Sequence, residues 1–172
     1  RSQRRLVFYS EGRNYWPNLG GLIRELLSKA DIPICYISSD ADDPGIHFKH
    51  DGYRSFVIDA GHIRNWLFEN IDTDYLVMTM PDLHQFQVKR SRNPVHYIYV
   101  QHALMSLHMA YRHGAFDHYD TIFCAGPHHA AEIRALEKKY HLPPIMFDAD
   151  ELEAIALGIG MVSNWTDDKF AA

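Results

Sequence analysis

Short apolar runs alternate with segments of helical periodicity along most of the chain. The runs are rich in Val, Ile, Leu, Tyr and Phe, which is typical of buried strands. They cover residues 6–9, 34–37, 56–58, 75–80, 95–100 and 120–125. Apolar residues recur at three- and four-residue spacing after Pro17 and again after Gly61, and residues 130–140 are rich in Ala, Glu, Lys and Arg. These three segments are therefore predicted to be helices.

Strands that alternate with helices and are apolar on both faces indicate a parallel sheet covered by helices. The predicted fold class is α/β, with a Rossmann-like parallel sheet and flanking helices. The chain contains neither GxGxxG after its first strand nor GxxxxGK[ST] anywhere, so the two common phosphate-binding loops are absent. A fold of this kind does not by itself indicate a function.

The pattern changes near His141, because Leu142-Pro143-Pro144 ends the last of these helices. A new acidic amphipathic helix is predicted, with Asp150 as its N-cap. Its apolar face consists of Leu152, Ile155, Ala156, Ile159 and Val162. We therefore divide the chain into a Rossmann-like domain, residues 1–141, and a helical C-terminal segment of different origin, residues 142–172.

The composition excludes several classes of protein. The 172 residues are 47% hydrophobic, which is enough for a core, and the formal net charge of −5 does not fit a nucleic-acid-binding protein. No apolar run reaches the about 18 residues that a membrane-spanning helix needs. Cys35 and Cys124 lie in apolar runs, where buried free thiols are expected, and this fits a reducing compartment. The chain begins at Arg1 without Met or a signal peptide, and is interpreted as a piece of a longer protein.

Histidines follow the last two predicted strands. His102 comes just after the fifth strand, whereas His128 and His129 follow the sixth and open a helix. Open α/β sheets bind ligands at the carboxyl ends of their strands, and His titrates near neutral pH. A proton-transfer or phosphate site is therefore expected here, with Ser106 as a further candidate in the same cleft. The alternative is that these are polar residues which only hydrogen-bond to a loop or a helix start.

Polar residues also follow the first and fourth predicted strands. Glu11 and Asn14 come after the first strand, and Asp82 follows Pro81 after the fourth. All three are expected at the ligand-binding edge of the sheet, where they would bind substrate; helix capping explains Asp82 equally well. The histidines fall at irregular intervals and no cysteine pair occurs, so we predict no metal site and no cofactor.

Several motifs together resemble the bacterial CDP-glycerol glycerophosphotransferase family over about residues 5–140. In order, the motifs are Phe8-Tyr9-Ser10-Glu11-Gly12, Tyr15-Trp16-Pro17, Met78-Thr79-Met80-Pro81-Asp82-Leu83, Lys89-Arg90-Ser91, His96-Tyr97-Ile98-Tyr99-Val100-Gln101-His102, Phe116-Asp117-His118-Tyr119-Asp120 and Gly126-Pro127-His128-His129-Ala130-Ala131-Glu132-Ile133. Each motif alone is weakly specific, and it is their order and spacing that indicate the family.

The resemblance implies half of a GT-B transferase, which moves glycerol phosphate from CDP-glycerol to a teichoic-acid-like or capsular polymer. The chain would supply the N-terminal, acceptor-side domain, and the C-terminal nucleotide-binding domain would be missing. In the family, a histidine after the strand equivalent to residues 95–100 is the base that deprotonates the acceptor hydroxyl. His102 matches it by position, although teichoic-acid polymerases often have Trp-His-Gly where this chain has Gln101-His102-Ala103.

Residues 142–172 are similar instead to the segment that joins the winged helix to the sensor domain in WYL-type transcriptional regulators. The DNA-reading helix and the sensor barrel of those regulators are not present in the sequence, so no regulatory function is implied. The simplest interpretation is a chimera, a composite sequence or a fusion.

Two functions follow from this reasoning. The first is the acceptor-binding half of a glycerophosphotransferase-like enzyme, cytoplasmic or at the inner face of the cell membrane, and inactive as an isolated chain. Its partners would be CDP-glycerol, a polyol-phosphate acceptor and the missing domain. The second is a non-catalytic α/β binding or scaffolding module with a helical tail for dimerisation or regulation. Homo-oligomers and peripheral membrane association of the full-length protein are also considered, and nucleic acid is not an expected partner.

Overall fold

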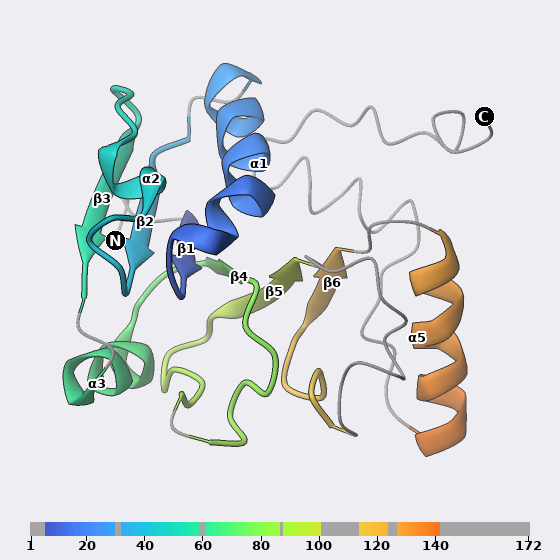
Figure 1. Ribbon diagram of the computed structural model, residues 1–172. Helices are drawn as coiled ribbons and strands as arrows, with labels where there is room; N and C mark the ends of the chain where they lie inside the picture. The colour runs from blue at the N-terminus through green and yellow to red at the C-terminus, as the bar shows by residue number, and fades with distance from the viewer. Residues whose placement is uncertain are drawn as a thin grey trace.

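The computed structural model describes residues 6–29, 32–58, 61–86, 88–100, 114–123 and 127–141. In this part of the chain, six strands form one parallel sheet in the order β3-β2-β1-β4-β5-β6 (Figure 1). They are β1 (Leu6–Ser10), β2 (Ile34–Ser38), β3 (Tyr53–Val57), β4 (Tyr75–Met78), β5 (His96–Val100) and β6 (Thr121–Phe123). The parallel α/β sheet expected from the sequence is confirmed.

The strand order reverses between β1 and β4. The chain runs outward from β1 through β2 to β3, then returns to place β4 on the other side of β1 and continues to β6. Connections after β1 and β4 leave the sheet in opposite directions, and such a switch point leaves a crevice outside the carboxyl ends of the two strands. Tyr9 pairs with Met78 at the end of this ladder, so the crevice begins just beyond these two residues.

Helices cover both faces of the sheet. They are α1 (Trp16–Lys29), α2 (Pro44–His47), α3 (His62–Asn70) and α5 (Pro127–Tyr140), with the 3-10 helix η1 (Arg13–Tyr15) before α1. Successive side chains of a strand point to opposite faces. Leu6 and Phe8 of β1 therefore enter one core with α1, whereas Val7 and Tyr9 enter a second core to which α3 contributes Phe68. This explains why the strands are apolar at every position.

The short helix α2 lies where the sequence indicates only a loop. Asp43 is its N-cap and is fully buried, and Pro44 is its first residue. The Asp43 carboxylate accepts hydrogen bonds from the Gly45 N–H at 2.8 Å, the Tyr36 hydroxyl at 2.9 Å and the Ser38 hydroxyl at 2.7 Å. Asp followed by Pro is typical of loops and of helix starts alike, so the sequence pattern does not separate the two.

The edge strand β3 differs most from its predicted position, residues 56–58. It begins three residues earlier, at Tyr53, which is buried and donates its hydroxyl to the Gly45 carbonyl at 2.7 Å. Phe56 and Val57 are about half exposed, at 50% and 49%. An edge strand buries less of its surface than a central one, so its residues need not all be apolar. The apolar run therefore indicates only the last part of β3.

Helix α3 is confirmed, but its apolar face is only partly buried. Phe68 packs edge-on against Tyr9, with 4.8 Å between ring centroids, and Leu67 packs against the same core. Ile63 and Trp66, which the spacing assigns to the buried face, are 64% and 66% exposed. The helix therefore touches the sheet mainly through its C-terminal half.

The remaining boundaries deviate by a few residues. Strand β6 begins one residue later than predicted, at Thr121, and α5 begins three residues earlier, at Pro127. Cys35 is a free thiol on β2 and is partly exposed, not buried. Cys124 and the predicted tail helix lie outside the described residues. No helix in the described ranges is long and apolar enough to cross a membrane.

The connection from β4 to β5 is anchored by Arg90. Its guanidinium donates to the carbonyls of His118 at 2.6 Å and Val95 at 3.0 Å, and to both carboxylate oxygens of Asp120 at 3.2 and 2.8 Å. It also lies over the Tyr97 ring, 4.5 Å from the centroid. This side chain joins two motifs that are about thirty residues apart in the sequence.

Candidate functional site

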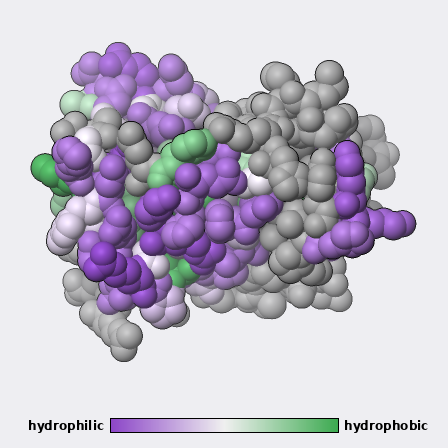
Figure 2. All heavy atoms as spheres, turned by 90° about the horizontal axis from the view of Figure 1, so that it is seen from below, coloured by the Kyte–Doolittle hydropathy of each residue, from purple (hydrophilic) through white to green (hydrophobic). Residues whose placement is uncertain are grey.

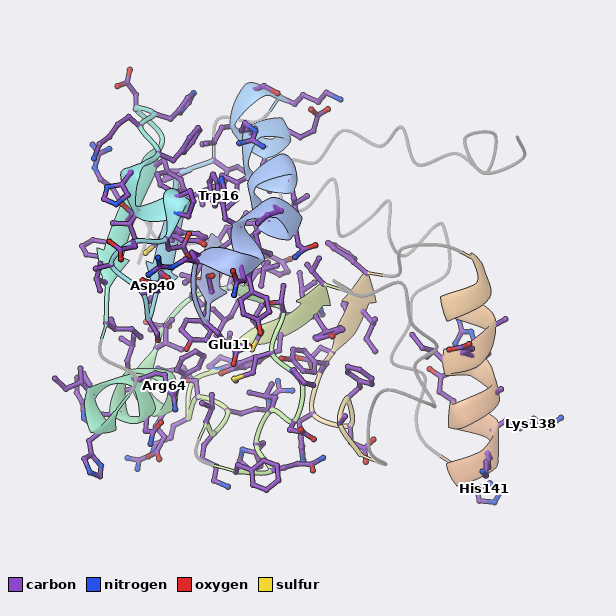
Figure 3. All side chains as sticks on the ribbon, in the orientation of Figure 1. Glu11, Trp16, Asp40, Arg64, Lys138 and His141 are labelled. Carbon is purple, nitrogen blue, oxygen red and sulfur yellow. The ribbon has the colours of Figure 1, made fainter. Side chains whose placement is uncertain are left out.

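Charged and polar side chains gather where β1 and β4 end. Glu11 follows β1, and Arg64 belongs to the first turn of α3; Figure 3 labels both at this edge of the sheet. Glu11 interacts electrostatically with Arg64 and accepts a side-chain hydrogen bond from Tyr15 of η1. The loop after β1 and the first turn of α3 thus bring a carboxyl group and a guanidinium together at the switch point.

Burial raises the pKa of the Glu11 carboxyl above its ordinary value. The positive charge of Arg64 and the hydrogen bond from Tyr15 both lower it, but the loss of solvation is the largest influence. A raised carboxyl pKa in a crevice is common at functional sites, because it lets the group hold or accept a proton near neutral pH.

Replacing Glu11 with Gln is expected to stabilise the protein at pH 8 and to have little effect at pH 4. A carboxyl whose native pKa is raised binds its proton more tightly in the folded chain than in the unfolded chain. Its contribution to stability is complete below the unfolded pKa and is lost as the pH rises through the native pKa. Gln does not ionise and avoids that loss. Urea unfolding of wild type and Glu11→Gln between pH 4 and 8 measures the difference.

Glu25→Gln is the matched control, because Glu25 lies on the exposed side of α1 beside Lys29. This variant should not gain stability relative to wild type as the pH rises. An equal pH trend for the two variants would mean that burial of Glu11 has no consequence for stability.

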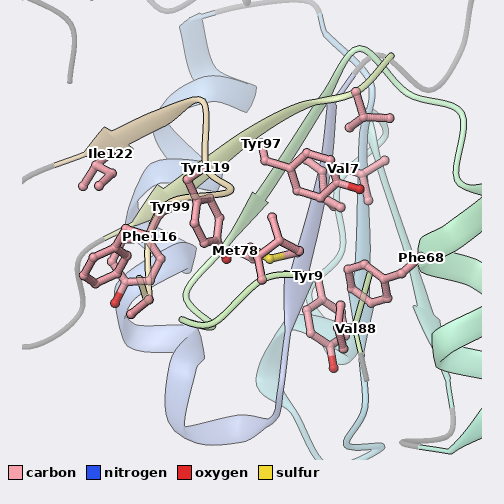
Figure 4. Packing of buried hydrophobic residues seen from close by; sticks show 14 of the residues in the cluster. Val7, Tyr9, Phe68, Met78, Val88, Tyr97, Tyr99, Phe116, Tyr119 and Ile122 are labelled. Atoms are coloured by element: carbon pink, nitrogen blue, oxygen red, sulfur yellow. The ribbon is translucent and has the colours of Figure 1, made fainter. Parts of the chain in front are cut away.

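Tyr119 is bound to the chain just after β4. It is 2% exposed and packs 5.3 Å from Tyr99 between ring centroids (Figure 4), and its hydroxyl donates to the Met80 carbonyl. Burial raises its pKa most, and the nearby charges of Glu11 and Asp82 raise it further. Two predicted site residues, Glu11 and Asp82, are therefore both near enough to one buried phenol to affect its pKa.

Asp82 occupies a tight turn after β4. Its φ of 61° is in the left-handed region, its N–H donates to the Ala115 carbonyl at 2.8 Å, and its carbonyl accepts from Gln85 at 3.2 Å. No helix begins within 83–86 or 88–94, so helix capping is not the explanation for this residue. Asp tolerates the left-handed region better than most residues.

Among the described residues, the buried side-chain atoms Arg64 Nε, Asn65 Oδ1 and Thr79 Oγ1 have no hydrogen-bond partner. Arg64 and Asn65 are neighbours on α3, and Thr79 follows β4 and is 1% exposed. An unsatisfied buried polar atom costs about 1–3 kcal/mol, so such atoms call for an explanation, and a bound polar ligand is one.

The loops after β1 and β2 are joined by ion pairs. Arg13 donates to Asp40 at 2.8 Å and to Asp42 at 2.9 Å, and the hydrogen bond from Arg13 lowers the pKa of Asp40 to about 2. The Tyr9 hydroxyl lies 3.0 Å from Ser39 Oγ in the same region. These contacts hold one wall of the crevice in place.

The predicted site residues fall into three groups. Glu11 and Asp82 both interact electrostatically with Tyr119. Asn14 is exposed on η1, and His128 and His129 lie at the start of α5, as expected. His102 and Ser106 lie outside the described residues. Within the ranges that the structure describes, no group of three His, Cys, Asp or Glu side chains could hold a metal ion.

Arg64 and Asn65 belong to the candidate site but were not predicted from the sequence. They lie on an amphipathic helix between apolar residues, where a charged residue normally faces solvent. The available signal was topological: α3 follows β3, so its first turn must lie at the carboxyl edge of a parallel sheet.

An open hollow of about 580 Å³ lies at the opposite edge, where β4 and β5 begin. Its lining includes Asp74, Arg90, His96 and Asp120. Burial lowers the pKa of His96, whose Nε2 lies 2.6 Å from the Thr121 hydroxyl, and Arg90 is engaged with Asp120. These groups already bind one another, so we assign the hollow to the anchoring of the β4–β5 connection.

Comparison with known proteins does not assign the chain to a family. No protein-family model, no curated protein and no solved structure matches the chain.

Proposed function

We propose that this chain is the acceptor-binding half of a glycerophosphotransferase-like enzyme with a GT-B architecture. The observation that supports the proposal is the group of interacting polar side chains at the switch point, namely Glu11, Arg64, Asp82 and Tyr119. Three of these four residues belong to motifs that resemble the CDP-glycerol glycerophosphotransferases. The acceptor would be a polyol phosphate such as a teichoic-acid-like polymer.

The crevice has the chemistry that a polyol phosphate requires. Hydroxyl groups both donate and accept hydrogen bonds, and Asn65 Oδ1 and Thr79 Oγ1 are buried without partners in the described structure. The guanidinium of Arg64 offers donors in the planar arrangement that suits phosphate oxygens. Glu11 would accept a hydrogen bond from an acceptor hydroxyl and balance the charge of Arg64 when the site is empty.

The proposed reaction is an in-line displacement at phosphorus. The terminal hydroxyl oxygen of the acceptor forms a bond to the β-phosphorus of CDP-glycerol, and the bond from that phosphorus to the bridging oxygen breaks. CMP leaves with the electron pair, and the hydroxyl proton passes to a base. By motif resemblance that base is His102, and general-base help of this kind contributes about 10²–10⁴-fold.

Arg64→Gln is expected to weaken binding of a glycerol phosphate oligomer about tenfold or more, because a hydrogen bond to a charged group contributes roughly 1.5–3 kcal/mol. Glu11→Gln should weaken it less, since Gln keeps an acceptor oxygen. Isothermal titration calorimetry of this chain with the oligomer measures both variants. Arg54→Gln is the matched control, since Arg54 is exposed on the edge strand β3.

Equal affinities for wild type, Arg64→Gln and Arg54→Gln would contradict the proposal. In the same samples, release of CMP from CDP-glycerol should stay at background, because a GT-B active site needs both domains. Robust turnover by this chain alone would also contradict it.

A further inference from the structure

Three basic side chains lie close together between the β4–β5 connection and the turn that precedes β6. The rings of His84 and His118 are 4.9 Å apart between centroids, with 59° between their planes. Lys89 Nζ donates to the carbonyl oxygen of His84 at 3.0 Å. We refer to His84, His118 and Lys89 as the basic cluster.

The backbone holds the His84 ring in a defined place. Its φ of 67° is in the left-handed region, which is uncommon for residues other than glycine, and its N–H donates to the Val88 carbonyl at 2.8 Å. The ring Nδ1 accepts a hydrogen bond from the Arg90 N–H at 3.0 Å. In the neutral ring the proton is therefore on Nε2, which leaves Nε2–H as the donor for a ligand.

The charges around His84 are of one sign. Burial lowers its pKa, and the charges of His118, Lys89 and Arg90 lower it further. The same two segments carry three carboxylates, Asp82, Asp117 and Asp120. Asp120 forms an ion pair with Arg90, the charge of Asp82 raises the pKa of Tyr119, and Asp117 is exposed to solvent.

Repulsion among basic groups is relieved by an anion between them. We propose that the basic cluster binds a phosphate group of the polyol-phosphate acceptor, one repeat away from the hydroxyl that reacts. The inference rests on the proposed function for the identity of the ligand.

The position of the cluster fits a repeating acceptor. His84 lies two residues after Asp82, and His118 directly precedes Tyr119, so short pieces of chain join the cluster to two of the switch-point residues. The β4–β5 connection extends to the lower face in Figure 1, and Figure 2 shows that this face is mostly hydrophilic. A polymer that places its terminal hydroxyl in the crevice would continue over this face with a phosphate at every repeat.

A divalent metal fits the cluster less well than phosphate. The nitrogen Nδ1 of His84 is occupied by the Arg90 N–H, and the positive charges of Lys89 and Arg90 oppose a cation. Phosphate is favoured by the same charges, and its oxygens accept from an imidazole N–H and an ammonium group alike.

Proton NMR of the imidazole rings tests the inference with inorganic phosphate as the first probe and a glycerol phosphate oligomer as the second. Phosphate should raise the pKa of His84, because an anion favours the charged imidazole, and should shift the ring signals of His118. By linkage, affinity for the oligomer, whose internal phosphodiesters do not titrate in this range, should then rise about threefold or more from pH 8 to pH 6. Lys89→Gln, His84→Gln and His118→Gln should each weaken this effect; the hydrogen bond from Lys89 to His84 is exposed, so its loss should leave the fold intact.

His47→Gln is the control, since His47 is exposed on α2. Equal shifts at His47, no shift at His84 and His118, or shifts with Zn²⁺ but not with phosphate would each overturn the inference. Oligomer binding that depends on Arg64 but not on the cluster would overturn it and leave the proposed function standing. Phosphate shifts at the cluster, combined with oligomer binding that is indifferent to Arg64→Gln, would support the phosphate site and contradict the proposed function.

Discussion

Gly45→Ala is expected to destabilise the protein by about 2–3 kcal/mol, the cost of forcing a methyl group into a full core. A Cβ at this position would lie 2.4 Å from Tyr36 Cε1 and 2.7 Å from Trp16 Cε3. The two rings pack edge to face at 5.5 Å, and the Tyr36 hydroxyl is bound to Asp43, so neither ring can move freely. Gly45 also accepts the hydrogen bond from Tyr53 through its carbonyl. Urea unfolding measures the effect.

Gly21→Ala is the matched control and should have the opposite sign. A Cβ at Gly21 would meet nothing within 4 Å, and the residue lies inside α1. Ala forms helices better than Gly by about 0.5–1 kcal/mol, so this variant should be more stable than wild type. If both glycine variants changed stability by the same amount, the tight packing of α2 against Tyr36 and Trp16 would be wrong.

Arg90→Ala is expected to cost about 2–3 kcal/mol of unfolding free energy, less than a fully buried ion pair because Arg90 and Asp120 are 28% and 34% exposed. The variant would leave the Asp120 carboxylate and the carbonyls of Val95 and His118 without their donor. The Tyr97 ring would also lose its cation–π contact. Chemical denaturation followed by tyrosine fluorescence measures the change.

Two variants show whether the shape of the guanidinium matters. Arg90→Lys keeps the charge but cannot reach all these acceptors from one planar group, so it should recover only part of the lost stability. Arg92→Ala removes a side chain that is 76% exposed and paired with Glu69, and its effect should stay within about 0.5 kcal/mol. Wild-type stability in Arg90→Lys would show that charge alone anchors the connection.

The central part of the fold follows from local sequence patterns. Strands β1, β2, β4 and β5 are buried on both faces, so nearly every position is apolar and the run of residues marks the strand. The edge strand β3 lacks this constraint on its second half, and its position was predicted three residues late. The short helix α2 depends on Asp43 reaching Tyr36 and Ser38, which is tertiary information that a local pattern does not contain.

The candidate site was predictable only in part, for a related reason. Glu11 and Asp82 directly follow strands, so the topology rule brings them to one edge, and the structure agrees. Arg64 reaches the same edge from a helix, and its sequence context resembles an ordinary solvent-facing position. Its identification needs the relative placement of α3 and β1, which depends on packing between Phe68 and Tyr9.

The place of β1 in the sheet has a consequence for how the protein is made. Of the six described strands, β1 is synthesised first, yet it lies in the interior of the sheet, with β2 on one side and β4 on the other. Until the chain has been synthesised past Met78, one edge of β1 has no native neighbour. Unpaired strand edges promote association between chains, and non-local parallel pairing forms slowly. The nascent polypeptide therefore passes through a stage in which one edge of a fully buried strand is unpaired.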